Sequence, residues 1–242
     1  MTERLFLDDA YLDRADAVVL AVEPGFVILD RSPFYARSGG QPGDRGTLVW
    51  DGHTLDVTEA LKGEADAIRH AVAPGPLPPP GTKLLARIDV AHRRRHMRMH
   101  TALHLLCSLL PGAAVTGGQI GADRSRLDFD LAQSPDKDAL AAGLATLIGA
   151  DHPVTTEWVD EAVLDANPGL VRTLSVKPPR GTGRLRLVRI GGSEPVDLQP
   201  CGGTHIRATG EIGGVTILKI ENKGRQNRRI ALALTEFDEE EP

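Results

Sequence analysis

The sequence predicts an α+β protein that begins with a small β-barrel and continues as helices laid on an antiparallel sheet. The first ninety residues consist of short apolar segments separated by Gly and Pro, a pattern typical of small barrels. Between residues 92 and 110 Gly and Pro are absent, and Met and Leu recur at helical spacing. Beyond this helix, strand-like and helix-like segments follow one another, as in an α+β fold.

The N-terminal β-barrel domain is expected to span residues 1–90. Its strands are apolar or β-branched segments bounded by turn residues, and they cover 17–22, 25–29, 46–50, 54–57 and 83–90. The Pro-rich segment 74–81 is expected to be a loop or linker, because Pro lacks a backbone N–H and fixes φ.

A second domain is expected over residues 91–236, followed by an acidic tail at 237–242 that is expected to be disordered. Two helices are predicted, 92–110 and 135–150, and Ser134 is the expected N-cap of the second. A short helix is predicted over 161–166, and strands are predicted over 125–131, 153–159, 184–190, 211–220 and 229–234.

Net charge is −5, so the chain lacks the bulk basicity that often marks nucleic-acid-binding proteins. Basic residues are nevertheless grouped in three runs, which the acidic tail balances in the total. These runs are either solvated faces or contacts to a nucleic-acid backbone, and the sequence leaves both interpretations open. The first run supplies the candidates Arg93, Arg94 and Arg98, the second comprises Lys177, Arg180, Arg184, Arg186 and Arg189, and the third supplies Lys219, Lys223, Arg225 and Arg228.

No apolar run approaches the roughly 18 residues that a membrane-spanning helix needs. The polar N-terminus lacks the apolar segment of a signal peptide. We therefore expect a cytoplasmic protein with no membrane contact. Two cysteines do not make a disulfide framework, which fits that compartment, and Cys107 is expected to be in the core.

Two short motifs far apart in the sequence supply three imidazoles and one thiol. The first, HTALH, places His100 and His104 one turn apart on the predicted helix, where both could bind one ion. The second, CGGTH, sets Cys201 and His205 on either side of a double glycine that allows a tight turn. Nitrogen and sulfur ligands suit zinc above magnesium or calcium, so the sequence predicts a Zn²⁺ site at these four residues.

Other interpretations of these motifs stay open. The histidines could be ordinary polar helix residues, and Cys201 a small buried one. A zinc ion could be structural, with four protein ligands, or catalytic, with three ligands and a water. The Gly-rich turn favours catalysis because it allows a substrate to approach closely. His96, one turn before His100, is expected at the surface or facing a phosphate rather than on the metal.

Four motifs in order resemble the editing domain of alanyl-tRNA synthetase, and more closely the free-standing AlaX-type editing proteins. The resemblance covers most of the chain, and it is carried by residues 29–46, RMHTALHLL at 98–106, CGGTH at 201–205 and TGEIG at 209–213. Since 242 residues leave no room for a class II aminoacylation domain, the chain looks like a protein that edits in trans.

The resemblance implies a β-barrel followed by a zinc-binding editing domain. It implies hydrolysis of the ester that joins serine, or glycine, to the terminal adenosine of alanine tRNA, so the tRNA acceptor end is the expected partner. It also places the loop of Gly39, Gly40 and Gln41 near the reacting ester. Ser32 stands where the family usually has Thr, so Ser32 and Gln41 are the predicted catalytic-site contacts to the amino acid.

Two other functions fit the same motifs. One is another zinc-dependent aminoacyl-tRNA hydrolase, resembling the threonyl-tRNA synthetase editing domain, although the barrel half argues against it. The other is a non-catalytic tRNA-binding module whose structural zinc supplies folding energy. If the protein is an editing enzyme, zinc could activate water or position the substrate, and Cys201 would be a poor nucleophile once bound to metal. The sequence predicts no oligomeric state.

Overall fold

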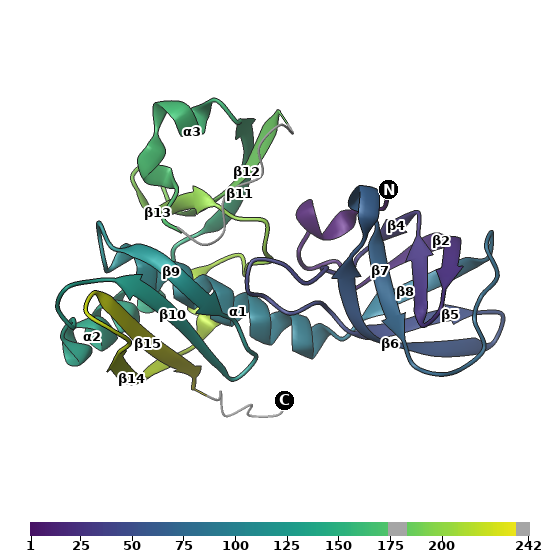
Figure 1. Ribbon diagram of the computed structural model, residues 1–242, viewed down its shortest axis with the longest axis horizontal. Helices are drawn as coiled ribbons and strands as arrows, with labels where there is room; N and C mark the ends of the chain where they lie inside the picture. The colour runs from purple at the N-terminus through teal and green to yellow at the C-terminus, as the bar shows by residue number, and fades with distance from the viewer. Residues whose placement is uncertain (174–182, 236–242) are drawn as a thin grey trace. The chain divides into compact units, whose positions relative to one another are not determined.

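The computed structural model describes residues 1–173 and 183–235. The chain divides into two compact units, Met1–His96 and Met97–Pro242, which we call the N-terminal unit and the C-terminal unit (Figure 1). Part of the second basic run and the acidic tail lie outside the described residues, namely Lys177, Arg180 and 237–242.

The N-terminal unit contains a closed barrel of six antiparallel strands in the order β2-β3-β7-β6-β5-β8, which confirms the predicted barrel. Closure leaves no unpaired edge, so every strand of the barrel finds two neighbours. Val19, Leu29, Leu48 and Ile68 are among the buried side chains that form its core. The strands are β2 (Arg14–Glu23), β3 (Phe26–Leu29), β5 (Gly46–Trp50), β6 (His53–Lys62), β7 (Ile68–Val72) and β8 (Lys83–Ile88), and a short β1 (Glu3–Arg4) pairs in parallel with β4 (Arg31–Ser32).

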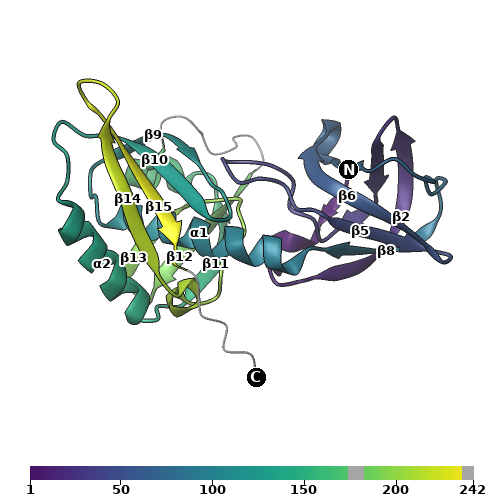
Figure 2. The same cartoon turned by 90° about the horizontal axis from the view of Figure 1, so that it is seen from below.

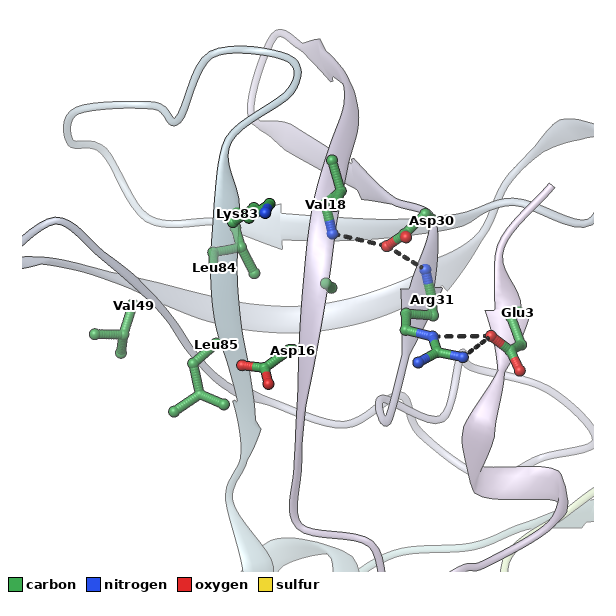
Figure 3. Close-up of a pocket in the computed structure, with 10 residues that line it drawn as sticks. Glu3, Asp16, Val18, Asp30, Arg31, Val49, Lys83, Leu84 and Leu85 are labelled. Carbon is green, nitrogen blue, oxygen red and sulfur yellow. Dashed lines mark hydrogen bonds and ion pairs between the residues drawn. The ribbon is translucent and has the colours of Figure 1, made fainter.

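A pocket of about 670 Å³ is lined by residues of the barrel strands β2 and β8 and their neighbours (Figure 3). Three of the charged side chains that line it, those of Glu3, Asp30 and Arg31, form hydrogen bonds to one another or to the backbone. Arg31 donates to Glu3 at 2.6 Å, and Asp30 accepts the backbone N–H of Val18 at 2.7 Å. The residues that line this pocket include none of the predicted site residues, so the candidate site lies elsewhere.

The C-terminal unit holds most of helix α1 (Val90–Ser108) and a four-stranded antiparallel sheet in the order β14-β15-β10-β9. Helix α2 (Lys137–Gly149) packs along β14 (Figure 2). Helices on an antiparallel sheet confirm the α+β class. The strands of this sheet are β9 (Ala114–Gln119), β10 (Arg124–Asp130), β14 (Val215–Asn222) and β15 (Asn227–Leu234).

A second, three-stranded antiparallel sheet completes the C-terminal unit. Its central strand β12 (Arg184–Gly191) lies between β11 (Val154–Asp160) and β13 (Pro195–Pro200). Leu164 of the short helix α3 (Val163–Ala166) packs with leucines of β12 in a small core of its own.

Several expectations for the elements need correction. The N-cap of α2 is Asp136, whose carboxylate accepts the N–H of Ala139 at 2.8 Å, whereas the Ser134 hydroxyl bonds Asn222. The strand predicted from residue 211 begins only at Val215, because the preceding residues form a 3-10 turn. Strands β7, β9 and β13 were not predicted, since charged residues, Gly or Pro interrupt their apolar pattern. Within the described part of the chain, no helix is long and apolar enough to cross a membrane.

Candidate metal centre

Helix α1 carries two of the predicted metal ligands. His100 and His104 are 8% and 5% exposed, and their ring centroids lie 5.2 Å apart. The helix runs from Val90 to Ser108 without Gly or Pro. The spacing of four residues therefore places both imidazoles on one helix face.

The loop that follows β13 carries the other two ligands. The N–H of Cys201 donates to the carbonyl of Arg186 at 3.2 Å, which continues the pairing of β13 with β12. The buried guanidinium of Arg186 also donates to the carbonyl oxygens of Cys201 at 2.8 Å and Gly203 at 3.0 Å. Arg186 thus fixes the CGGTH loop from the neighbouring strand.

All four predicted ligands converge on one point. Cys201 Sγ lies 3.5 Å from Nε2 of His100 and 3.4 Å from Nε2 of His205. The ligand atoms of these residues and of His104 lie within 4.8 Å of one another, so the cluster could hold a metal ion. Ligands around one tetrahedral zinc ion are about 3.3–3.8 Å apart, which these spacings approach, and the nitrogen and sulfur donors suit zinc.

Hydrogen bonds to the far ring nitrogens orient two of the imidazoles. Nδ1 of His104 lies 2.8 Å from Oδ2 of Asp197, and Nδ1 of His205 lies 3.1 Å from the hydroxyl of Thr101. Gln199 donates to Asp197 at 2.8 Å and so steadies that carboxylate. With Nδ1 engaged in this way, Nε2 of each ring is left to face the cluster, the arrangement typical of metal-binding histidines.

Electrostatic interactions favour the thiolate form of Cys201, which is the form that binds metal ions. Burial raises the pKa of Cys201, but the neighbouring His100 and His205 outweigh this effect and hold the pKa well below its ordinary value. Burial lowers the pKa of His104, but the bonds to Asp197 and Cys201 outweigh it and raise the pKa to about 10. The lowered pKa favours the thiolate form of Cys201, which metal binding requires, and a metal bound at His104 would compete with a proton.

Ser32 is fully buried in the N-terminal unit, beside His70. Its hydroxyl lies 2.8 Å from Nε2 of His70 and accepts the N–H of Phe34 at 3.1 Å. Nδ1 of His70 lies 3.0 Å from the carbonyl of Val27, so Nδ1 carries the proton and the hydroxyl donates to Nε2. Burial lowers the pKa of His70 to about 4, which keeps the ring neutral. One acceptor position of the Ser32 oxygen is left for a further bond.

Gly39 and Gly40 form a tight turn between Ser38 and Gln41. Their φ angles are +56° and +84°, a combination that glycine adopts without strain. The backbones of Ser38 and Gln41 exchange hydrogen bonds of 3.1 and 2.9 Å across the turn. The Gln41 residue is 1% exposed. Ser32 and this turn belong to the N-terminal unit and the cluster to the C-terminal unit, so their roles at the site stay predictions.

Two of the predicted phosphate contacts are buried within their own units, which argues against that role. Arg93 and Arg228 are only 1% and 7% exposed. Arg93 pairs with the carboxylate of Asp44 and donates to the carbonyls of Ala10 and Pro33 at 2.7 and 2.6 Å. Arg228 donates to carbonyls of the β14–β15 turn. Both guanidiniums hydrogen-bond loops of their own unit and are largely shielded from solvent.

The other basic candidates differ from one another in exposure. Arg98 is half-buried and donates twice to the carbonyl of Ile212, at 2.8 and 3.0 Å, which ties α1 to the turn before β14. The side chains of Lys219 and Lys223 lie 3.1 and 3.7 Å from Glu221. The candidates that remain open to solvent are Arg94, Lys219, Lys223 and Arg225.

The expectation that His96 lies at the surface of α1 is wrong. The residue is only 3% exposed, and its Nδ1 lies 2.7 Å from the carbonyl of His92. Sequence reasoning also missed Asp197, Gln199 and Thr101, which support the cluster. The two β13 residues are polar, two positions apart and directly before the CGGTH motif. Polar residues on one face of a strand, next to candidate ligands, were the signal that could have found them.

Comparisons with known proteins define a class for this fold and cluster. Residues 185–231 match the family model described as the threonyl and alanyl tRNA synthetase second additional domain. Residues 9–91 match the model of the class II (A) tRNA synthetases. The barrel and the cluster-bearing unit are therefore both related to parts of tRNA synthetases.

Similarity over the whole chain narrows this class. The chain is 38% identical to alanyl-tRNA editing protein AlaX-M of Methanosarcina acetivorans, over 97% of this chain and 99% of that protein. It is 32% identical to AlaX-M of Saccharolobus solfataricus, over 95% and 98%. It is also 40% identical to alanine–tRNA ligase of Archaeoglobus fulgidus, over 91% of this chain but only 24% of the ligase. The chain belongs to the family of alanyl-tRNA editing proteins.

Proposed function

We propose that this protein is a trans-acting deacylase that hydrolyses the ester of serine, and of glycine, wrongly attached to alanine tRNA. One observation carries the proposal: a buried His/Cys cluster with oriented imidazoles lies in a chain that aligns with AlaX-M proteins almost end to end. The alignment with a quarter of an alanine–tRNA ligase supports the same chemistry. A substrate of this kind implies a cytoplasmic protein.

We propose zinc as the resident metal, held by the side chains of His100, His104, Cys201 and His205. Bound zinc supplies Lewis acidity, which favours ionisation of water and polarises an ester carbonyl. The protein's own contribution is preorganisation. Asp197 and Thr101 fix two rings, and Arg186 fixes the loop, so little rearrangement is needed when substrate arrives.

Selection of the amino acid is proposed to involve Ser32 and Gln41. Because the Ser32 hydroxyl already donates to His70 and accepts from Phe34, it has one acceptor position left for a donor of the substrate. The hydroxyl of a serine substrate can fill such a position, whereas alanine and glycine leave it empty, so this contact accounts for release of serine and not for release of glycine. An alanine ester would leave this buried polar group unpaired. That cost disfavours its binding, so the correctly charged tRNA is spared.

The acceptor end of the tRNA is proposed to be held by the exposed cations Arg94, Lys219, Lys223 and Arg225. Such contacts to phosphate position the RNA without reading its sequence. They also make binding weaker as salt rises.

The test follows ester loss from alanine tRNA charged with serine, glycine or alanine. Wild type should release serine and glycine and spare alanine. His104→Ala, Cys201→Ala and chelator-treated protein should lose the activity, because each removes part of the cluster. His152→Ala is the matched control, since this half-buried histidine of the same unit lies outside the cluster and its variant should keep full activity.

Two results would overturn the proposal. Binding of the RNA without release, together with unfolding on chelation, would indicate a tRNA-binding module with structural zinc. Release of serine from threonine tRNA but not from alanine tRNA would indicate a threonyl-type hydrolase.

A further inference from the structure

The chain has two tryptophans, and they differ in exposure. Trp50 is 8% exposed in the barrel, whereas Trp158 on strand β11 is 43% exposed. An exposed indole offers a broad flat ring that a ligand can cover. The position of Trp158 relative to the His/Cys cluster indicates which kind of ligand could cover the ring.

Strand register places Trp158 on the side of the three-stranded sheet that faces the cluster. Trp158 pairs with Arg186, and Gln199 pairs with the residue two positions further along β12. Paired residues, and residues two positions apart, share one face of a sheet. Trp158 therefore lies on the same face as Gln199 and Asp197, whose side chains contact His104.

The separation suits a nucleotide. The N–H of Cys201 donates to the carbonyl of Arg186, so Trp158, Arg186 and Cys201 form one row across the three strands. Neighbouring strands are about 4.8 Å apart, which puts the backbones of Trp158 and Cys201 about 10 Å apart. A nucleoside whose ester faces the cluster is long enough to bring its own base, or the adjacent base, to the indole.

A cation accompanies the ring. The guanidinium carbon of Arg184 lies 5.4 Å from the ring centroid of Trp158. An aromatic ring with a neighbouring Arg is the combination that binds single-stranded nucleic acid, since the base stacks and the cation attracts phosphate.

We propose that Trp158, with Arg184 beside it, is a stacking platform for a nucleobase at the single-stranded 3′ end of the tRNA substrate. The inference rests on the proposed function for the identity of the ligand and adds a contact that positions the terminal nucleotides. Stacking accepts any base, so the platform contributes affinity rather than sequence recognition.

The test uses an uncharged RNA hairpin with a 3′ overhang ending in CCA and the same hairpin with a blunt end. Wild type should prefer the overhang, and Trp158→Ala should weaken overhang binding about 5- to 150-fold while leaving blunt binding unchanged. Trp158→Phe should keep most of the preference, because it keeps a ring. An exposed position makes a change in thermal stability beyond about 0.5 kcal/mol unexpected.

Fluorescence separates this contact from a general effect on folding. The overhang hairpin should quench tryptophan emission in wild type and in Trp50→Phe, but not in Trp158→Phe, which keeps only the buried indole. Equal overhang binding by wild type and Trp158→Ala, or quenching that persists in Trp158→Phe, would overturn the inference.

The deacylation assay distinguishes this inference from the proposed function. If wild type and Trp158→Ala release serine with the same KM, the platform is refuted while the enzyme stands. If wild type releases nothing but its overhang preference depends on Trp158, the platform stands and the enzyme assignment fails.

Discussion

Replacing Arg93 by Met tests whether this arginine is a structural residue or an RNA contact. Its guanidinium is 1% exposed and pairs with Asp44, which is 2% exposed, and it also donates to two carbonyls. Removing the cation leaves Asp44 charged and buried, with the backbone N–H of Tyr35 as a remaining donor. Breaking one side of a buried pair costs about 3–5 kcal/mol, a large part of the stability of a small domain.

The assay is urea unfolding monitored by far-UV circular dichroism, with Arg94→Met as the matched control. Arg94 is exposed and lies over the ring of Tyr11, so its loss should cost about 1 kcal/mol or less. The effects on RNA binding should be the reverse, with a larger loss for Arg94→Met than for Arg93→Met. Arg94→Met should lower the slope of log affinity against log salt by about 0.7–0.9, the share of one phosphate contact. An unfolding midpoint for Arg93→Met equal to that of wild type would refute the structural role.

Three further outcomes are expected. Because the folded pKa of His70 is about 4 and its ordinary value is 6.5, stability should fall as pH drops through this window, by about 2 kcal/mol at about pH 5. His70→Gln should abolish this part of the pH dependence in denaturant titrations, and an unchanged profile would contradict the neutral buried ring. Ser32→Thr and Ser32→Val should change the relative release of serine and glycine from alanine tRNA, and identical ratios would remove Ser32 from the selectivity argument. Asp197→Asn should weaken zinc binding about 10- to 100-fold in competition with a chelator, whereas Asp128→Asn, which breaks an ion pair with Arg229 elsewhere in the unit, should not. Equal zinc affinities for the two variants would argue against an orienting role for Asp197.

Local periodicity explains which parts of the site the sequence could reveal. His100 and His104 are four residues apart on a helix without Gly or Pro, so their shared face followed directly from helix geometry. The same periodicity also shows why Arg93 is buried and not exposed to a phosphate. Residues 93, 97, 100 and 104 form one stripe of α1, and all of them are buried. A charge run shows that cations are present but not in which direction each one points.

Strand periodicity explains the burial of Arg228 in the same way. Along β15, residues 228, 230 and 232 are buried and alternate with more exposed neighbours. The period of two, which places Arg228 on the same face as two apolar residues, is visible in the sequence itself and indicates an inward-facing side chain. By contrast, the contact of Asp197 with His104 joins residues 93 positions apart. The local pattern of β13 marks Asp197 as a candidate but does not identify its partner, because the contact depends on how β13 packs near α1.

The distance along the chain between the two ligand pairs has a consequence for unfolding. A metal that joins α1 to the loop after β13 would close a segment of roughly a hundred residues, comparable to a long-range covalent cross-link. In the chain-entropy description such a closure restricts the denatured ensemble by about 4–5 kcal/mol. The ion would then act like a long-range cross-link, and its removal would lower the free energy of unfolding by adding freedom to the denatured chain.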